Sequence, residues 1–188
     1  MSEVISKIYE SAIDRDAQEQ FARLGHVAIA NVYDPSLGEL AASVIDNTTR
    51  YRMSGNLSGQ IGDVRFRHLD FNNPLKQVVL SIASSLNQLS DGSENITYED
   101  LSAHAIDHRP GAKGLLHQDG GLAVATLKGV SRLEFADDGR NIDTSYELIP
   151  GRIVVMDNSR RLWHRGVAGN ESSRTGLVIH PRAGTRSS

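Results

Sequence analysis

Three residues in the second half of the chain have types and spacing suited to holding a metal ion. His117 and Asp119 lie two positions apart, and His164 follows 47 residues after His117. In an extended segment, residues two positions apart face the same side, so both side chains can reach one ion. Two imidazoles and one carboxylate on one face suit iron(II) and leave other coordination positions open. The sequence therefore predicts a metal centre at His117, Asp119 and His164.

The His-x-Asp spacing is weak on its own, because the chain contains it twice, at His117–Asp119 and at His68–Asp70. The second pair lies in a segment without periodicity, and no predicted element stands opposite it. The first pair follows the turn residues Pro110-Gly111 and precedes Gly120-Gly121. Glycines there let the backbone turn without a side chain that would crowd the ion. This context assigns the metal to His117–Asp119.

The first half of the chain is predicted to contain three helices and one strand. The first helix runs from Ile13 to Leu24 and stops at Gly25, and the apolar strand 26–30 follows. Asp34-Pro35 and Asn73-Pro74 open the second and third helices. The apolar stripes expected to face the core are Leu37, Leu40, Ala41, Val44 and Ile45, then Leu75, Val78, Val79, Ile82, Leu86 and Leu89.

The second half changes to short strand-like runs separated by glycine, proline, asparagine and aspartate. Ile153–Met156 is apolar on both faces, which is typical of an inner strand. No periodicity is found from Arg50 to Asn73, and the glycine-rich segment 51–62 is a candidate lid. The predicted strands are Ile96–Asp107, Ala123–Leu127, Ser131–Phe135, Ser145–Ile149, Arg152–Asp157 and Thr175–His180.

Helices followed by short strands predict an α+β fold with a β-sandwich or jelly-roll core. The helical part covers about residues 1–95 and the core about residues 96–182. A chain of 188 residues suits one well-buried domain, so we interpret 1–188 as a single domain.

Composition narrows the function classes. The chain has no cysteine, which excludes disulfides, thiolate metal sites and cysteine nucleophiles, and fits a reducing compartment. A net charge of -3 favours neither nucleic acid nor an anionic membrane as a partner. We find no signal-peptide pattern and no apolar run of membrane-spanning length. The expected location is the cytoplasm.

Four features, in this order, resemble the Fe(II)/2-oxoglutarate-dependent dioxygenase superfamily. Residues 108–119 are similar to the turn that leads into that family's first two metal ligands. Residues 151–157 and 162–167 are similar to its late hairpin, which carries the distal histidine. Residues 174–179 are similar to the next strand, whose arginine holds 2-oxoglutarate. The resemblance covers about residues 101–182 and implies a double-stranded β-helix, the jelly roll of this superfamily.

The resemblance implies catalysis with Fe(II), 2-oxoglutarate and O2, and succinate as a product. His117, Asp119 and His164 would be the metal-binding and catalytic residues. Arg174 would bind the far carboxylate of 2-oxoglutarate, because a planar guanidinium pairs with both carboxylate oxygens. Arg165 adjoins a ligand and is expected to point to the opposite face of its strand.

Two departures from the family pattern concern the co-substrate. Many relatives have a serine where this chain has Gly176. Thr175 or Ser173 is expected to supply the hydrogen bond that this serine makes, or no residue does. Relatives often have a tyrosine where His108 stands, so His108 is expected to bind 2-oxoglutarate or to line its pocket. His104 is four positions before His108, a spacing that would put both on one strand face, but a half-buried strand residue is the favoured interpretation.

The expected reaction is hydroxylation of an unactivated C–H bond in a small molecule, such as an amino acid or a natural-product intermediate. Candidate substrate contacts are Arg65, Arg67, His68 and Trp163. Three alternatives stay open: a hydroxylase of a peptide or protein side chain, a cupin-like metalloprotein with a different metal-dependent reaction, and a non-catalytic binding domain.

Overall fold

The computed structural model describes residues 13–46, 64–68, 73–90, 95–171 and 173–182. The helices are α1 (Arg15–Leu24), α2 (Pro35–Asp46) and α3 (Asn73–Leu89), with short 3-10 turns η1 (Tyr98–Asp100) and η2 (Asn158–Arg160). The strands are β1 (His26–Ile29), β2 (Val64–His68), β3 (Leu101–His108), β4 (Ala123–Lys128), β5 (Ser131–Phe135), β6 (Thr144–Leu148), β7 (Ile153–Met156), β8 (His164–Ala168) and β9 (Arg174–Pro181).

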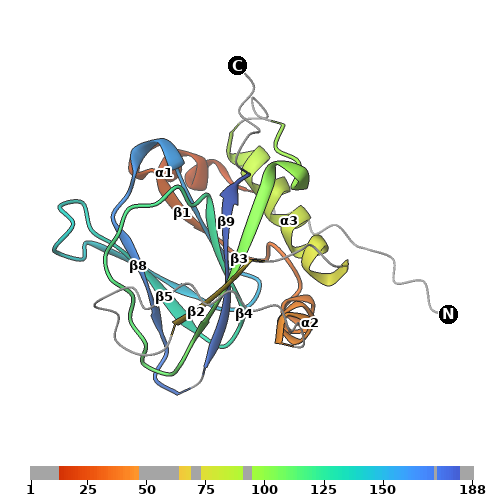
Figure 1. Ribbon diagram of the computed structural model, residues 1–188. Helices are drawn as coiled ribbons and strands as arrows, with labels where there is room; N and C mark the ends of the chain where they lie inside the picture. The colour runs from red at the N-terminus through yellow and green to blue at the C-terminus, as the bar shows by residue number, and fades with distance from the viewer. Residues whose placement is uncertain (1–12, 47–63, 69–72, 91–94, 172, 183–188) are drawn as a thin grey trace.

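The described strands form two antiparallel sheets. The larger has the order β1-β7-β4-β9-β3-β2, and the smaller has the order β6-β5-β8. The smaller sheet packs against one face of the larger sheet, and helices α2 and α3 lie on the other side (Figure 1). The site predicted from the sequence lies between the two sheets.

Alternation along the strands of the larger sheet builds two separate apolar cores, because successive side chains point to opposite faces. Ala123 and Leu177 belong to the core shared with the helices, and their neighbours Val124 and Val178 belong to the core shared with the smaller sheet. Strand β7 pairs with β1 on one side and β4 on the other, and all four of its residues are buried. The predicted inner strand is therefore confirmed.

The helix boundaries follow from local capping chemistry. The Asp14 carboxylate accepts a hydrogen bond from the Ala17 N–H at 2.8 Å, and α1 ends at Gly25 with φ of 75°. Asp34 precedes Pro35 and accepts a hydrogen bond from the Ser36 N–H at 2.8 Å. The predicted starts of α2 and α3 are confirmed, whereas α1 begins at Arg15, two residues after its predicted start.

The buried face of α2 differs from its prediction in one residue. Leu40 is 54% exposed, whereas Ala41, Ala42 and Ile45 are buried. A Cβ on Gly38 would lie 3.0 Å from the Tyr33 ring and 3.1 Å from the Leu127 carbonyl oxygen. The helix therefore approaches β4 through its small residues, and this turns Leu40 towards the outside.

Two strands depart from the sequence expectation. Strand β2 lies inside the segment 50–73, which was expected to be irregular, and pairs with β3 over its whole length. Strand β8, which pairs with β5, is absent from the runs predicted by pattern but agrees with the late hairpin that the resemblance implied. Both are only five residues long and lie at sheet edges, so the partner strand decides their conformation more than their own pattern does. The candidate lid at 51–62 lies outside the described residues.

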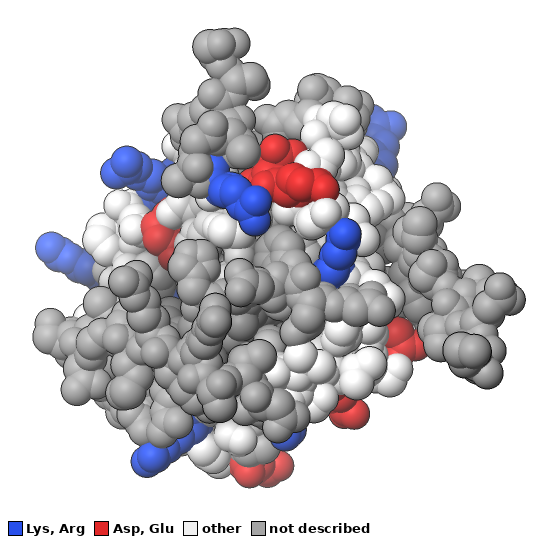
Figure 2. Space-filling view, turned by 45° about the vertical axis from the view of Figure 1, so that its right-hand side comes forward, with Lys and Arg blue, Asp and Glu red and all other residues white. Residues whose placement is uncertain are grey.

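The described surface carries mixed charge. Figure 2 shows Lys and Arg side chains standing apart from one another, with Asp and Glu between them. None of the described helices has both the length and the apolar character needed to cross a bilayer.

Candidate metal centre

His117 and His164 lie directly opposite each other on paired segments. The His117 N–H donates to the His164 carbonyl at 3.0 Å, and the His164 N–H donates to the His117 carbonyl at 2.9 Å. Residues in such a pair present their side chains on the same face. The two imidazole rings have centroids 4.6 Å apart. Backbone pairing thus brings together two ligands that are distant in sequence.

Asp119 completes the cluster. Its Oδ2 lies 3.4 Å from His117 Nε2, and its Oδ1 lies 3.6 Å from His164 Nε2. Its Oδ1 also accepts a hydrogen bond from the Gly121 N–H at 2.8 Å, which fixes the carboxylate orientation. One ligand atom from each of the three residues lies within 4.8 Å of the others. Adjacent ligands of one metal at bond lengths near 2.1 Å stand about 3 Å apart, so the cluster fits an ion with little movement.

The backbone selects the tautomer of both histidines. Nδ1 of His117 lies 2.9 Å from the Leu115 carbonyl oxygen, and Nδ1 of His164 lies 3.0 Å from that of Leu162. A carbonyl only accepts, so each Nδ1 carries the hydrogen, and each Nε2 faces Asp119 and is the nitrogen left to bind a metal ion. Metal-bound histidines usually have this second hydrogen bond. The donor set therefore suits a divalent metal.

The protonation states also suit a cation. Burial alone would raise the pKa of Asp119, but hydrogen bonds from His117 and Gly121, with nearby His164, hold it well below its usual range. Burial lowers the pKa of His164, whereas the hydrogen bond to Asp119 raises the pKa of His117. A bound divalent ion would displace the proton that Asp119 favours on His117.

Arg174 is a buried cation close to this cluster. It is 2% exposed, and among the described residues no hydrogen-bond partner reaches its Nε and no carboxylate pairs with it. Burial lowers its pKa to about 10, so the guanidinium stays charged at neutral pH. An uncompensated buried charge is costly, so this position calls for an anion.

His108 is the nearest polar neighbour of Arg174. Its Nδ1 lies 3.5 Å from Arg174 Nη1, and burial with the nearby guanidinium lowers the pKa of His108 to about 3. The imidazole is therefore neutral and leaves the charge of Arg174 uncompensated. His108 lines the same cavity as Arg174, and lining this pocket was one of the two roles expected for it from the sequence.

Gly176 explains how Arg174 fits. The guanidinium lies over this residue, and a Cβ there would lie 2.6 Å from Arg174 Nη2 and 3.0 Å from the Ala125 carbonyl oxygen. Gly166, across the cavity, would place a Cβ 3.2 Å from Nη1. Glycine at position 176 therefore makes room for the arginine.

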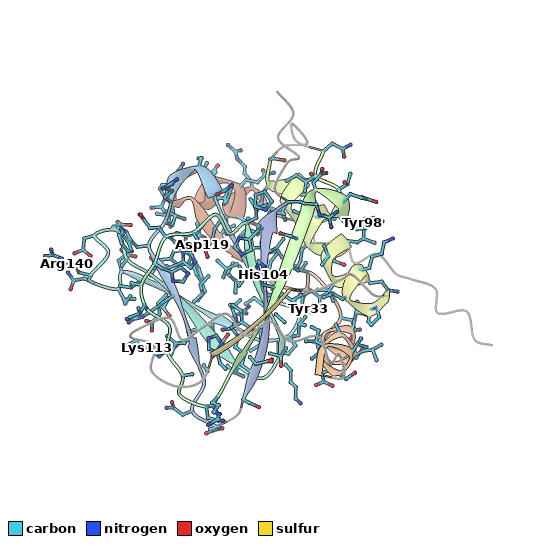
Figure 3. All side chains as sticks on the ribbon, viewed as in Figure 1. Tyr33, Tyr98, His104, Lys113, Asp119 and Arg140 are labelled. Carbon is cyan, nitrogen blue, oxygen red and sulfur yellow. The ribbon has the colours of Figure 1, made fainter. Side chains whose placement is uncertain are left out.

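The ligand cluster and Arg174 share one cavity of about 110 Å³ between the sheets. Asp119 and His104 both lie in the space between the two sheets in Figure 3. The lining residues are His104, Ile106, His108, Gly114, His117, Asp119, Val124, Leu133, His164, Gly166, Arg174, Val178 and His180. The cavity therefore contains both a set of candidate metal ligands and an arginine suited to binding an anion.

Several predicted residues lie elsewhere. Thr175 is absent from the cavity lining and donates to Asp107 Oδ1 at 3.1 Å, because it faces the other side of β9. Ser173 is exposed. Trp163, a candidate substrate contact, lines a separate pocket with Gln118 and Arg161 and is absent from the lining of the cavity that contains the cluster. Arg165 turns away from the site, as expected, and pairs with Glu134 at 2.7 Å.

The remaining candidate residues lie on strands β2 and β3. The backbone of β2 is described, but the side chains of the candidate substrate contacts Arg65, Arg67 and His68 lie outside the description. His104 shares the cavity face with His108, which the sequence raised but did not favour. The period-two spacing of His104, Ile106 and His108 was the signal that could have found it.

Comparisons with solved structures agree with this architecture. A prolyl-4-hydroxylase from Pseudomonas putida aligns with a TM-score of 0.58 and 17% identity, covering 87% of this chain and 95% of that one. A Trichoplax adhaerens prolyl hydroxylase in complex with a hypoxia inducible factor peptide fragment aligns at 0.57 and 14%, covering 87% and 86%. HygX from Streptomyces hygroscopicus, with nickel and 2-oxoglutarate bound, aligns at 0.54 and 13%, covering 92% and 89%.

No family model and no curated protein matches the sequence. At these low identities the structural matches establish the fold. The chain has the double-stranded β-helix fold found in 2-oxoglutarate oxygenase structures, and the predicted fold class is confirmed.

Proposed function

We propose that this protein is an Fe(II)- and 2-oxoglutarate-dependent oxygenase that hydroxylates a small molecule. One observation carries the proposal: a single cavity contains a two-histidine, one-carboxylate cluster and a buried arginine without a described anionic partner. The fold is also that of the HygX structure, which holds nickel and 2-oxoglutarate.

The chain's own residues have distinct roles in this proposal. His117, Asp119 and His164 would hold Fe(II) on one face and leave the opposite face open. Arg174 would bind the far carboxylate of 2-oxoglutarate, and that carboxylate would compensate the buried guanidinium charge. His108, neutral at physiological pH, would help to orient the guanidinium through its Nδ1.

The walls between these groups are apolar, with Ile106, Val124, Leu133 and Val178 lining the cavity. Such walls exclude water and hold the methylene carbons of a small acid. When bound, Fe(II) and 2-oxoglutarate supply the oxidation of a substrate C–H bond with O2, and 2-oxoglutarate becomes succinate and CO2. The protein supplies the binding, the orientation and the dry surroundings.

The test is an anaerobic titration of the Fe(II)-loaded protein with 2-oxoglutarate, followed by succinate measurement after O2 is admitted. We expect a visible charge-transfer band on 2-oxoglutarate addition and succinate release afterwards. Asp119→Ala and His164→Ala are expected to abolish both signals. Arg174→Met should need about 100-fold more 2-oxoglutarate to produce the band, because charge-assisted hydrogen bonds are lost.

Arg152→Met is the matched control, because this arginine is outside the cavity and, within the described part of the chain, donates only to the Glu147 carbonyl at 3.2 Å. Metal binding without any 2-oxoglutarate band would favour the cupin-like alternative. A band without succinate release would favour a binding domain. Activity that survives the combined Asp119→Ala and His164→Ala substitutions would overturn the proposed metal ligands.

A further inference from the structure

His104 and His180 lie towards the opposite end of the cavity from Arg174. Strand β3 pairs with β9 so that His108 faces Arg174 and His104 faces Val178. The guanidinium lies over Gly176, so Val178 is two residues and His180 four residues further along β9, about 7 and 13 Å at the usual rise of a β-strand. The cavity therefore has a guanidinium at one end and two imidazoles well along its length.

The metal ligands lie between these two ends. Gly166, two residues after His164, lies against the guanidinium of Arg174. Gly121, which binds the Asp119 carboxylate, would place a Cβ 3.6 Å from Val178 Cγ1, next to the imidazole end. A molecule held by His104 and His180 would therefore approach the metal from the side opposite Arg174.

The two imidazoles form one unit. Their ring centroids are 5.2 Å apart at an interplanar angle of 65°, and both rings line the cavity. Both residues are half-buried, so they are reachable yet partly desolvated. Imidazole nitrogens bind carboxylate oxygens as hydrogen-bond donors, and the interaction strengthens when the ring is protonated.

The polar groups that line this end of the cavity suit an acid better than an amine. Among the described residues that line the cavity, Asp119 is the only carboxylate, and its oxygens are directed to the metal ligands. No described lining residue is therefore left to pair with a substrate ammonium group. The two imidazoles, in contrast, match a carboxylate.

We propose that His104 and His180 bind a carboxylate of the substrate, so the substrate class is a small organic acid with an apolar body. This inference rests on the proposed function, because it takes Arg174 as the site of 2-oxoglutarate. The apolar side chains Ile106 and Val178 lie beside the two imidazoles and would contact the carbon skeleton near the metal. The two acids would thus enter one cavity without competing for one cation.

The experiment uses anaerobic protein loaded with Fe(II) and saturating 2-oxoglutarate, and two probes of the same shape. The probes are 4-methylpentanoate and 4-methylpentanamide, and their binding is measured by titration calorimetry. We expect the loaded protein to bind the carboxylate at least tenfold more tightly than the amide. His104→Gln and His180→Gln are each expected to remove most of that preference, with the 2-oxoglutarate band unchanged.

Lys113→Ala is the control for general loss of positive charge, because Lys113 lies outside the cavity lining, on the segment that leads to His117. Equal binding of acid and amide, no binding of either, or a preference that persists in both glutamine variants would overturn the assignment. Absence of the 2-oxoglutarate band in the unmodified protein would instead reject the proposed function, and this inference with it.

Discussion

At the scale of single residues, the co-substrate end of the cavity depends on a missing side chain. Arg174 is a large, fully buried side chain, and its guanidinium lies directly over Gly176 and next to Gly166. Protein interiors are close-packed, so a side chain of this size needs a matching gap. Glycine at 176 provides that gap, and the position cannot accept a Cβ unless the arginine or β4 moves.

Gly176→Ser is therefore expected to weaken 2-oxoglutarate binding about tenfold. The added Cβ would meet Arg174 Nη2 at 2.6 Å and push the guanidinium out of place. The measurement is the 2-oxoglutarate titration of the anaerobic Fe(II) protein. In an Arg174→Met background the same substitution should add little further loss, and tighter binding in the single variant would contradict this explanation.

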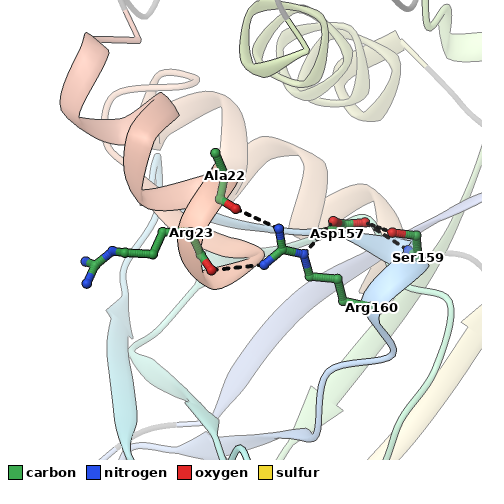
Figure 4. A network of polar contacts seen from close by, with 5 residues as sticks. All are labelled: Ala22, Arg23, Asp157, Ser159 and Arg160. Carbon is green, nitrogen blue, oxygen red and sulfur yellow. Dashed lines mark hydrogen bonds and ion pairs between the residues drawn. The ribbon is translucent and has the colours of Figure 1, made fainter.

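At the scale of elements, helix α1 holds the turn that leads to His164. Arg160 in η2 donates to the carbonyl oxygens of Ala22 at 2.6 Å and Arg23 at 3.0 Å, at the C-terminal end of α1 (Figure 4). Its Nε also donates to Asp157 Oδ2 at 3.0 Å. A cation suits a helix C-terminus, whose last carbonyls have no partner within the helix. The network thus links α1 to the segment between β7 and β8.

Arg160→Ala is expected to lower the free energy of unfolding by about 1–2 kcal/mol, because two helix carbonyls and one carboxylate lose their donor. In a chain of this size that corresponds to a fall of roughly 2–8 °C in the melting temperature. Differential scanning calorimetry of the metal-free protein measures it. Arg152→Ala, a surface arginine with one backbone contact, should shift stability by less than about 0.5 kcal/mol, and equal effects of the two changes would refute the network's role.

At the scale of the whole molecule, a buried histidine between the two sheets makes the stability of the fold depend on pH. His108 is 5% exposed, and burial beside Arg174 lowers its pKa to about 3. The unfolded chain binds a proton there near pH 6.5, whereas the folded chain does not. The contribution of His108 to the free energy of unfolding is therefore fully present above pH 6.5 and is lost as the pH falls towards 3.

His108→Asn should reduce this acid sensitivity. The unfolding free energy of the variant is expected to fall less steeply between pH 6 and 4, by about 1 kcal/mol per pH unit, because one titrating group is removed. Denaturant melts across that range measure the slope. His26 and His164 also have lowered pKa values and remain in both proteins, so a slope should persist in the variant. Equal pH dependence of the unfolding free energy in the two proteins would contradict the lowered pKa of His108.

The sequence by itself determined the residue types of the candidate metal ligands, the starts of α2 and α3, the end of α1 and most strands. These features are local: Asp14 and Gly25 cap a helix through their own neighbours, and Ile153–Met156 carries the pattern of an inner strand. The resemblance also pointed to Arg174, which the structure places in one cavity with the ligands. Local chemistry is enough for such predictions because their partners are close in the chain.

Only the tertiary structure decided which distant residues meet. Pairing of β3 with β9 places His104 in the cavity, while the pleat turns Thr175 to the far side. It also shows that Gly176 is the space occupied by the Arg174 guanidinium. Strand register and side-chain packing set these contacts, and both depend on the partner strand, which no single segment of sequence contains.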